Sequence, residues 1–374
     1  MLLQFRLSTH VASHHQYSNA YEHHVFQPLK TERCGINLYG LPRAFESLVL
    51  PSLVENVIRP NAPYGCDYFM HYYKQSQEPA GRSGLGGHLN PREVLLLKDR
   101  VEHVTEMSGG PPRKPTVLFK SDKEEDFWKQ YGDLVEKVRN TKDSQGRYVY
   151  YPWKAVTYTH PLTTDNILKM WHSIQESYKL MEQHAQAQGI EYTRVAMLRS
   201  DVVYMTPINI FEREQGVRDV QNKVAVVPAF GKHPVSDRLI YGPKKAVEIW
   251  AAQRFARLED HVQFILKHDS GWGMHSERFV KHALLEPIRQ LGFDIVEHPT
   301  MCFFRARADE SVWITDCNDP DPHVTAPSVT ANIGPNPRAK LEALLQRKCG
   351  SETKKRKPIV TALDFSRHGS NSKQ

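Results

Sequence analysis

The sequence predicts an α/β fold, with a mixed sheet flanked by helices in a single catalytic domain. Short apolar runs alternate with stretches of helical spacing over most of the chain. Strand, helix and strand follow one another at its start, as in a βαβ unit. Hydrophobic residues make up 40% of the chain and aromatic residues 10%, which is ample for a packed core. No apolar window approaches about 18 residues, so no membrane-spanning helix is predicted.

The βαβ unit comes first along the chain. Cys34 to Tyr39 is a short apolar run that ends at Gly40, and it predicts a buried strand. Apolar residues at helical spacing then predict a helix that Pro60 terminates. A second strand begins at Cys66. The next expected elements are a glycine-rich surface loop at 76–93, a strand at 116–119 and a charged amphipathic helix at 121–140.

The middle of the chain has the clearest pattern. Thr164 and Asp165 open a predicted helix of about 24 residues that ends at Gly189. A strand then begins at Arg194 and leads directly into the triplet that ends at Asp201. The remaining predicted elements are strands at 223–228, 293–296 and 301–305 and helices at 243–255 and 276–291.

Composition divides the chain into three parts. Residues 1–32 are rich in His, Ser and Tyr, and they are expected to be a disordered or truncated leader because their apolar start is too short for a signal peptide. Residues 33–317 form the predicted domain, and residues 318–374 form a Pro-rich and basic tail. Basic runs like the one at 347–357 more often lie in solvated tails than in nuclear addresses, so a nucleic-acid-binding protein is the least favoured class.

The five cysteines lie far apart, and no pair has the spacing of a zinc site. They are expected to be buried or free thiols, with one isolated disulfide as the alternative.

Charged residues follow several predicted strands, and functional sites of open α/β sheets lie beyond the carboxyl ends of the strands. Asp201 follows the strand that begins at Arg194, and a carboxylate there can bind a hard divalent cation. Arg199 can meet a phosphate as a bidentate donor. Arg43 lies in the turn after the first strand, where a nucleotide would rest. The alternative for Arg199 and Asp201 is an ion pair that merely ends a strand.

Other candidates come from the second half of the chain. Asp237 follows a later strand and can act as a general base or only stabilise a turn. Glu277, at a helix start, is a second candidate catalytic acid or only complements the helix dipole. Trp272 offers an aromatic face to a sugar. His298 is a possible metal ligand, although a lone histidine is more often structural. Arg305 can hold phosphate. His71 and Lys120, near the ends of two strands, are weaker candidates.

The order of these motifs resembles a group of glycosyltransferase-like proteins that are widespread in algae and plants and have the GT-A fold. The resemblance covers residues 33–310, and the segments that carry it are CGINLYGLPR, CDYFMHYY, RVAMLRSDVVY, VPAFGKHPVSDRLIYGPKKAVEIW and SERFVKHAL.

This resemblance implies a glycosyltransferase that moves a sugar from a UDP- or GDP-sugar donor to a hydroxyl of a glycan or glycoprotein. In GT-A enzymes an Asp-x-Asp motif binds Mn²⁺ or Mg²⁺ and the nucleotide diphosphate. Here Arg199 replaces the first Asp, so either Asp201 holds the ion alone or Arg199 partly replaces the ion. Asp237 matches the acceptor side, where an acid deprotonates the hydroxyl if the anomeric centre inverts.

The resemblance also implies a location in the Golgi or secretory pathway, with the cytoplasm as the alternative, and no nucleic-acid partner. The replacement of the first Asp by Arg199 favours a second possibility. This is a catalytically inactive GT-A-like module that binds sugars or acts as a scaffold.

Overall fold

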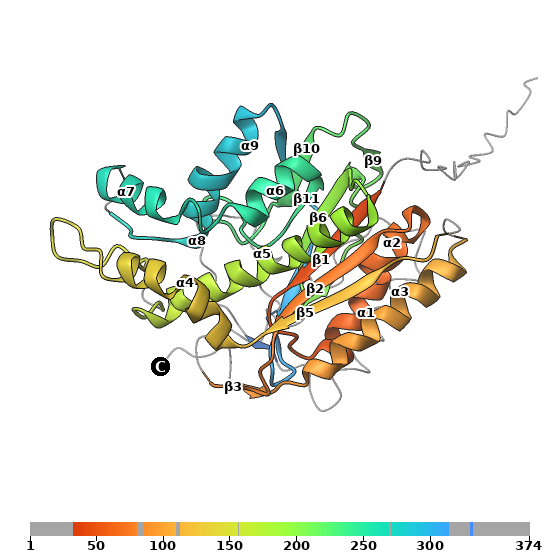
Figure 1. The fold of residues 1–374 in the computed structure, drawn as a ribbon, viewed down its shortest axis with the longest axis horizontal. Coiled ribbons are helices and arrows are strands. Elements are labelled where there is room, and N and C mark those ends of the chain that lie inside the picture. Colours follow the sequence, from red (N-terminus) through yellow and green to blue (C-terminus); the bar gives the residue numbers. More distant parts are fainter. Residues whose placement is uncertain are drawn as a thin grey trace, which may run out of the picture. The chain divides into compact units, whose positions relative to one another are not determined.

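A computed structural model describes residues 33–80, 86–109, 113–155, 157–268, 271–313 and 330–331. Its centre is a seven-stranded sheet (Figure 1). The order across the sheet is β12 (Asp294–His298), β10 (Val224–Pro228), β11 (Ile240–Pro243), β6 (Arg194–Arg199), β1 (Cys34–Tyr39), β2 (Asp67–Tyr73) and β5 (Val117–Asp122).

The sheet is mixed. β1 pairs in parallel with both β2 and β6, and β2 pairs in parallel with β5. β11 runs antiparallel to both of its neighbours, and β10 and β12 run parallel to each other. The expected class, a Rossmann-like mixed sheet flanked by helices, is therefore confirmed.

The chain builds this sheet outward from β1 in two directions. β2 and β5 extend it to one side, after which the chain returns to place β6 on the other side of β1. The strand order therefore reverses between β1 and β6. Crevices at such reversal points are the usual ligand sites of open α/β sheets.

Helices cover both faces of the sheet (Figure 1). On one face lie the helical turns η1 (Phe45–Val49), α1 (Leu50–Leu53), η2 (Val54–Ile58), α2 (Arg59–Asn61) and η3 (Ala62–Tyr64), with η4 (Pro91–Leu95) and α3 (Leu96–Met107). On the other lie α4 (Glu124–Arg139), α5 (Leu162–Gln188), α6 (Lys244–Ala252), α7 (Leu258–His268), α8 (Ser276–Phe279), η5 (Val280–Leu285) and α9 (Glu286–Gln290).

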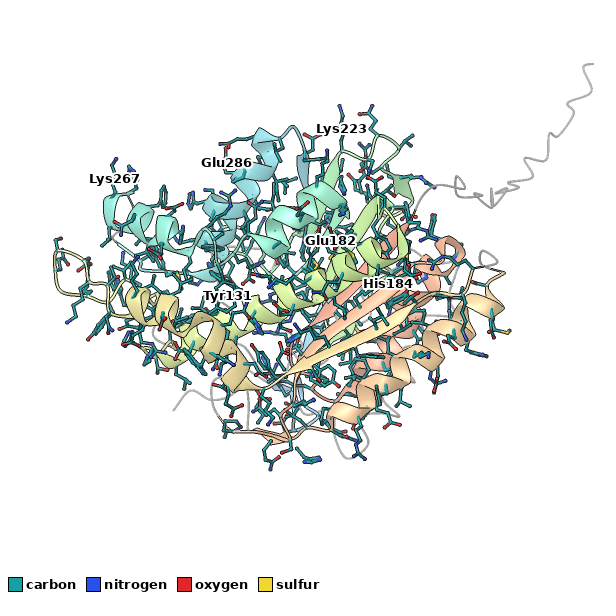
Figure 2. The ribbon with its side chains drawn as sticks, in the orientation of Figure 1. Tyr131, Glu182, His184, Lys223, Lys267 and Glu286 are labelled. Carbon is teal, nitrogen blue, oxygen red and sulfur yellow. A yellow bond between two sulfur atoms is a disulfide. The ribbon has the colours of Figure 1, made fainter. Side chains whose placement is uncertain are left out.

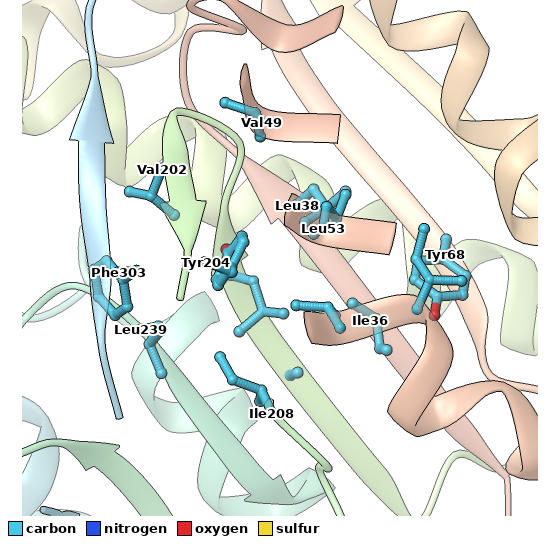
Figure 3. Packing of buried hydrophobic residues seen from close by; sticks show 14 of the residues in the cluster. Ile36, Leu38, Val49, Leu53, Tyr68, Val202, Tyr204, Ile208, Leu239 and Phe303 are labelled. Atoms are coloured by element: carbon cyan, nitrogen blue, oxygen red, sulfur yellow. The ribbon is translucent and has the colours of Figure 1, made fainter. Parts of the chain in front are cut away.

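Alternation along β1 explains how one strand serves both faces. Ile36 and Leu38 point into the cluster shown in Figure 3, which also contains Leu53 and Tyr204. Asn37, between them, points to the opposite face, where its side-chain amide donates to the Ala196 carbonyl at 3.2 Å. Side chains alternate across a strand, so a fully buried strand packs against both helical layers.

α5 is the long helix on the second face. It ends where the sequence predicts, because Gly189 adopts the left-handed conformation with φ 62° and closes the last turn. α4 packs on it, and Gln175 of α5 donates to the hydroxyl of Tyr131 of α4 at 3.0 Å (Figure 2).

A second sheet lies beside the first, with the strand order β15 (Thr330–Ala331), β14 (Val312–Trp313), β13 (Phe303–Ala306) and β7 (Val202–Tyr204). The strand predicted at 301–305 belongs to this sheet and not to the central one. The C-terminal tail, expected to carry no strand of the central sheet, supplies β15 to the second sheet through backbone pairing.

Two short hairpins complete the described elements, β3 (Gln77–Glu78) with β4 (Gly87–His88) and β8 (Glu212–Glu214) with β9 (Val217–Arg218). The sequence analysis did not predict α3, α7, β7 or β11. β7 and β11 are only three and four residues long, which is too short to show a period.

Cys34 and Cys66 form a disulfide, and Cys302 is disulfide-bonded as well, so the expectation of buried or free thiols is wrong at these three positions. The Cys34–Cys66 bond joins the first residue of β1 to the residue before β2. None of the described helices is both long enough and apolar enough to cross a membrane.

Candidate functional site

The reversal point of the sheet brings two turns together. Tyr39 ends β1 and Arg199 ends β6, and these two residues are paired in the sheet. The Ser200 amide then donates to the Tyr39 carbonyl at 2.9 Å. The turn that follows β1 and the turn that follows β6 therefore meet at the same edge.

Asp201 is the centre of this site and is only 1% exposed. Arg199 donates two hydrogen bonds of 2.8 Å to it, from Nε to Oδ1 and from Nη2 to Oδ2. Arg43 Nη1 donates to Oδ2 at 2.5 Å. Burial alone would raise the pKa of Asp201, but the two guanidinium groups lower it to about 2. Asp201 is therefore ionised near neutral pH, and its carboxylate positions Arg43 and Arg199.

Arg43 is held by its other nitrogens as well. Nε and Nη2 donate to the two carboxylate oxygens of Glu78 at 2.7 and 2.5 Å. The turn that carries Arg43 has left-handed backbone at Gly40, with φ 110°, and at Ala44, with φ 44°. Such a conformation costs alanine about 1–2 kcal/mol, and strain of this kind gathers at functional sites.

Two further arginines come from the second sheet: Arg305 lies in β13 and Arg307 directly follows it. The backbone amide of Ala306 donates to the Asp201 carbonyl at 2.8 Å, which brings β13 alongside the site. Arg307 is buried, and its pKa falls to about 9 because burial, Arg305 and Arg43 all oppose its charge. The surroundings of Asp201 are thus strongly positive.

A pair of acids lies next to this arginine cluster. Ser276 donates a short hydrogen bond to Asp237, and His275 Nδ1 lies 2.8 Å from Glu277 Oε2. Burial and the repulsion of Glu277 raise the pKa of Asp237. Burial acts in the same sense on Glu277, but the His275 imidazole outweighs it and lowers the pKa of Glu277.

Arg199 links the two halves of the site. Its charge acts on Asp237 as well as on Asp201. Tyr39 lies between the two halves, and its hydroxyl donates to the Arg238 carbonyl at 2.5 Å. The structure therefore gathers five predicted site residues into one region, namely Arg43, Arg199, Asp201, Asp237 and Glu277.

Arg254 is a member of this region that the sequence analysis missed. Its guanidinium is fully buried, 4.0 Å from the ring centroid of Trp250, and Nε donates to the Trp250 carbonyl at 3.0 Å. Nη1 and Nη2 have no hydrogen-bond partner in the described part of the chain. Burial lowers its pKa to about 10, and Tyr39 and Asp237 counteract this. Buried donors without partners are expensive and often mark a ligand.

The predicted metal role of Asp201 and His298 fits this geometry poorly. Both oxygens of Asp201 accept hydrogen bonds from guanidinium groups, so a cation there would have to displace an arginine. His298 ends β12, where its Nδ1 lies 3.4 Å from Thr300 Oγ1, and no contact among the described residues joins it to Asp201. A metal at these two residues stays a prediction, and the ion pairs of Asp201 with Arg43 and Arg199 argue against it.

Trp272 and Arg305 occupy different positions. Trp272 is 37% exposed, and the cations of Lys154 and Arg278 lie 5.1 and 4.8 Å from its ring centroid. Neither of these two contacts is with Arg43, Arg199 or Arg307. Arg305 pairs in the sheet with Val202, which directly follows Asp201, so it borders the site. Their ligand roles stay predictions.

A separate cluster at the same edge has the composition of a metal site. One potential ligand atom each from His71, Asp122 and His172 lies within 4.8 Å of the others. His71 comes from β2, Asp122 ends β5, and His172 comes from α5. The sequence analysis noted only His71, because Asp122 and His172 carry no spacing signal and meet it only through the fold.

The comparisons with known proteins add little to this geometry. No protein family model matches the sequence. No curated protein matches it significantly. Among solved structures, mouse xyloside xylosyltransferase 1 in its apo form is similar, with 11% identity and a TM-score of 0.30 over 71% of this chain and 84% of the other. Similarity this low carries no argument about activity. The association with algal and plant proteins finds no support in these comparisons.

Proposed function

We propose that the protein is a glycosyltransferase that takes its sugar from a nucleotide-sugar donor. The observation that carries the proposal is the convergence of Arg43 and Arg199 on Asp201 at the reversal point of the sheet. Both guanidinium groups already bind carboxylates, so in this proposal they act on a diphosphate through their positive charge, and this crevice is the usual ligand site in such sheets.

The arginines take the place of the divalent cation in this proposal. A leaving diphosphate accumulates negative charge as the bond to the sugar breaks, and fixed cations stabilise it. Asp201 orients Arg43 and Arg199 without neutralising the whole site, because Arg307 adds a further positive charge. The arrangement therefore supports donor binding that does not depend on Mn²⁺ or Mg²⁺.

The neighbouring acids supply the acceptor chemistry. The pKa values of Asp237 and Glu277 move in opposite directions, which is typical of pairs that divide acid and base roles. In an inverting transfer the acceptor hydroxyl oxygen bonds to the anomeric carbon and gives its proton to Asp237. The bond from that carbon to the diphosphate oxygen breaks, and the diphosphate leaves with the electron pair. Glu277 stays ionised beside His275 and keeps the pKa of Asp237 high.

The Cys34–Cys66 disulfide supports the expected location in the secretory pathway, because disulfides persist in oxidising compartments.

Replacing Asp237 by Asn tests this division of labour. The variant should keep the wild-type dissociation constants for UDP and GDP, since Asp237 touches no phosphate in the proposal. It should slow sugar transfer by roughly 10²–10⁴-fold, the usual contribution of a general base. Calorimetry with UDP and GDP and turnover with a panel of UDP- and GDP-sugars give the two readouts, and Asp260→Asn on the exposed side of α7 is the matched control. An unchanged transfer rate would remove Asp237 from catalysis.

The inactive sugar-binding module is the second candidate. The observation that favours it is the pairing of Asp201 with two arginines in place of an acidic metal-binding pair. If the wild-type protein binds nucleotide diphosphates but transfers and hydrolyses none of the donor sugars, this second function is the correct one.

A further inference from the structure

We propose that His71, Asp122 and His172 form a binding site for a divalent transition metal, with zinc as the expected occupant. The site lies between β2, β5 and α5. It uses none of the residues assigned above to the donor or acceptor, so it stands independently of the glycosyltransferase proposal.

The spacing of the three ligand atoms suits a small ion. His71 Nε2 lies 3.1 Å and His172 Nε2 lies 3.8 Å from Asp122 Oδ2. Bonds of about 2.0–2.1 Å in a tetrahedral site place neighbouring ligand atoms about 3.4 Å apart. These two distances bracket this value, and all three ligand atoms lie within 4.8 Å of one another.

The outer nitrogens of both histidines are already held. His71 Nδ1 lies 2.9 Å from Ser173 Oγ, which itself donates to the His71 carbonyl at 3.2 Å and accepts from the Gly40 amide at 3.0 Å. His71 Nε2 itself donates to Asp122 Oδ2 at 3.1 Å. Because the Ser173 oxygen can accept a hydrogen bond from Nδ1, the ring proton can move to Nδ1 when an ion takes its place on Nε2.

His172 repeats the arrangement. Its Nδ1 lies 2.7 Å from the hydroxyl of Tyr73, and that hydroxyl donates to the Lys169 carbonyl at 3.4 Å. In the same way, the Tyr73 oxygen can accept a hydrogen bond from His172 Nδ1 when an ion binds Nε2. Metal-binding histidines are oriented by hydrogen bonds of this kind at the nitrogen that does not bind the ion. Two lone pairs and a carboxylate then converge on one point.

The chemistry of the ligands selects the ion. Two imidazoles and one carboxylate suit zinc and related first-row metals better than Mg²⁺ or Ca²⁺, which prefer oxygen ligands. Lys120, 4.0 Å from Asp122 Oδ2, is itself paired with Glu176, so its charge is balanced before an ion arrives. The histidines are buried, but the Asp122 side chain is 16% exposed, so the cluster borders solvent.

Binding would join α5 to two strands near the proposed donor site. Ser173 connects the cluster to the Gly40 amide, and Gly40 begins the turn that carries Arg43. Ser173 therefore links an ion at this cluster to the turn that carries Arg43.

Metal titration of the full-length protein tests the site. After chelation and dialysis, Co²⁺ should produce the visible absorption bands of a site with fewer than six ligands, and Zn²⁺ should displace it at one equivalent. Asp122→Asn and His172→Gln should each weaken Zn²⁺ binding by at least about 100-fold, and Tyr73→Phe by about 10-fold, since it removes only an outer hydrogen bond. Circular dichroism checks that each variant is folded.

Two controls separate this site from other histidines. His261→Gln replaces a buried histidine of α7 outside the cluster and should leave the Co²⁺ spectrum unchanged. Replacing the histidine pairs at 14–15 and 23–24 by Gln tests adventitious binding by the N-terminal segment and should also leave it unchanged. The proposal is overturned if the wild-type protein shows no such bands, or if Asp122→Asn binds Zn²⁺ as tightly as the wild type. The cluster is then a hydrogen-bonded network only.

Discussion

At the scale of single residues, the function of a side chain depends on which charges surround it. Asp201 would be an ordinary metal ligand in isolation, but two arginines occupy both of its oxygens. Asp237 and Glu277 are both acids, yet their pKa values move in opposite directions because His275 pairs directly with Glu277 while burial and Glu277 dominate at Asp237. These differences assign binding to one acid and proton transfer to another.

Asp201→Asn should destabilise the protein. The substitution leaves two buried guanidinium groups without their carboxylate, which typically costs about 3–5 kcal/mol. A small effect would be expected only if Asp201 faced solvent, and it is buried. Urea denaturation of the wild type and the variant near neutral pH measures the loss. Equal free energies of unfolding would show that the ion pairs contribute nothing.

The same comparison has a definite pH dependence. The folded-state pKa of Asp201 is about 2, below its ordinary value of 3.8, so its stabilisation is present above 3.8 and is lost as the pH falls toward 2. This shift corresponds to about 2 kcal/mol. The stability difference between wild type and Asp201→Asn should shrink by that amount as acid is added, and a constant difference would contradict the pairing.

Arg254→Met should separate stability from activity. Each buried donor without a partner costs about 1–3 kcal/mol, while the stacking on Trp250 returns about 2 kcal/mol. Two such donors together cost about 2–6 kcal/mol, so the free energy of unfolding should stay level or rise by up to about 4 kcal/mol. Sugar transfer should fall at least tenfold because the charge of Arg254 acts on Asp237. Arg257→Met, a neighbour bonded to Gln253, is the control. Lower stability with full activity would make Arg254 a structural residue.

At the scale of elements, two constraints position the turn after β1. The disulfide fixes the start of β1 beside the start of β2, and α5 holds Gly40 at the end of β1 through Ser173. The turn between Gly40 and Ala44 can then adopt strained backbone because both of its flanks are fixed.

The disulfide should contribute measurably to stability. It closes a loop with a sequence separation of 32, for which loop-closure entropy gives about 3–4 kcal/mol. The double variant Cys34→Ala/Cys66→Ala should lose about that much in urea denaturation. Thiol alkylation of the unreduced, denatured wild type should leave both cysteines unmodified. Alkylation at both positions would show that the bond does not form.

Much of this architecture is predictable from local patterns. The apolar runs at Cys34 and Arg194, the helix that ends at Gly189, and the charged residues at strand ends all follow from period and turn chemistry. β11 was not predicted, because four residues that include Gly242 and Pro243 carry no strand period. The cluster of Asp122 with His172 could not be predicted either, since residues on separate elements meet only after folding.

At the scale of the whole molecule, the reversal of strand order decides where the site lies. β1 and β6 are far apart in sequence but adjacent in the sheet, so the turns after them share one edge. The acids at Asp237 and Glu277 reach the same edge from the opposite half of the chain. The electrostatic interaction of Asp237 with Arg199 joins the two halves into one site.

The most direct test of the account is nucleotide binding without metal. Calorimetric titration of the full-length protein with UDP and GDP in the presence of EDTA should show saturable binding of one of them. Arg199→Gln should weaken that binding at least tenfold, and Arg213→Gln, an exposed arginine of β8, should not. Added Mn²⁺ should change the wild-type dissociation constant little. Absence of binding without Mn²⁺, or undiminished binding in Arg199→Gln, would contradict the claim that arginines hold the diphosphate.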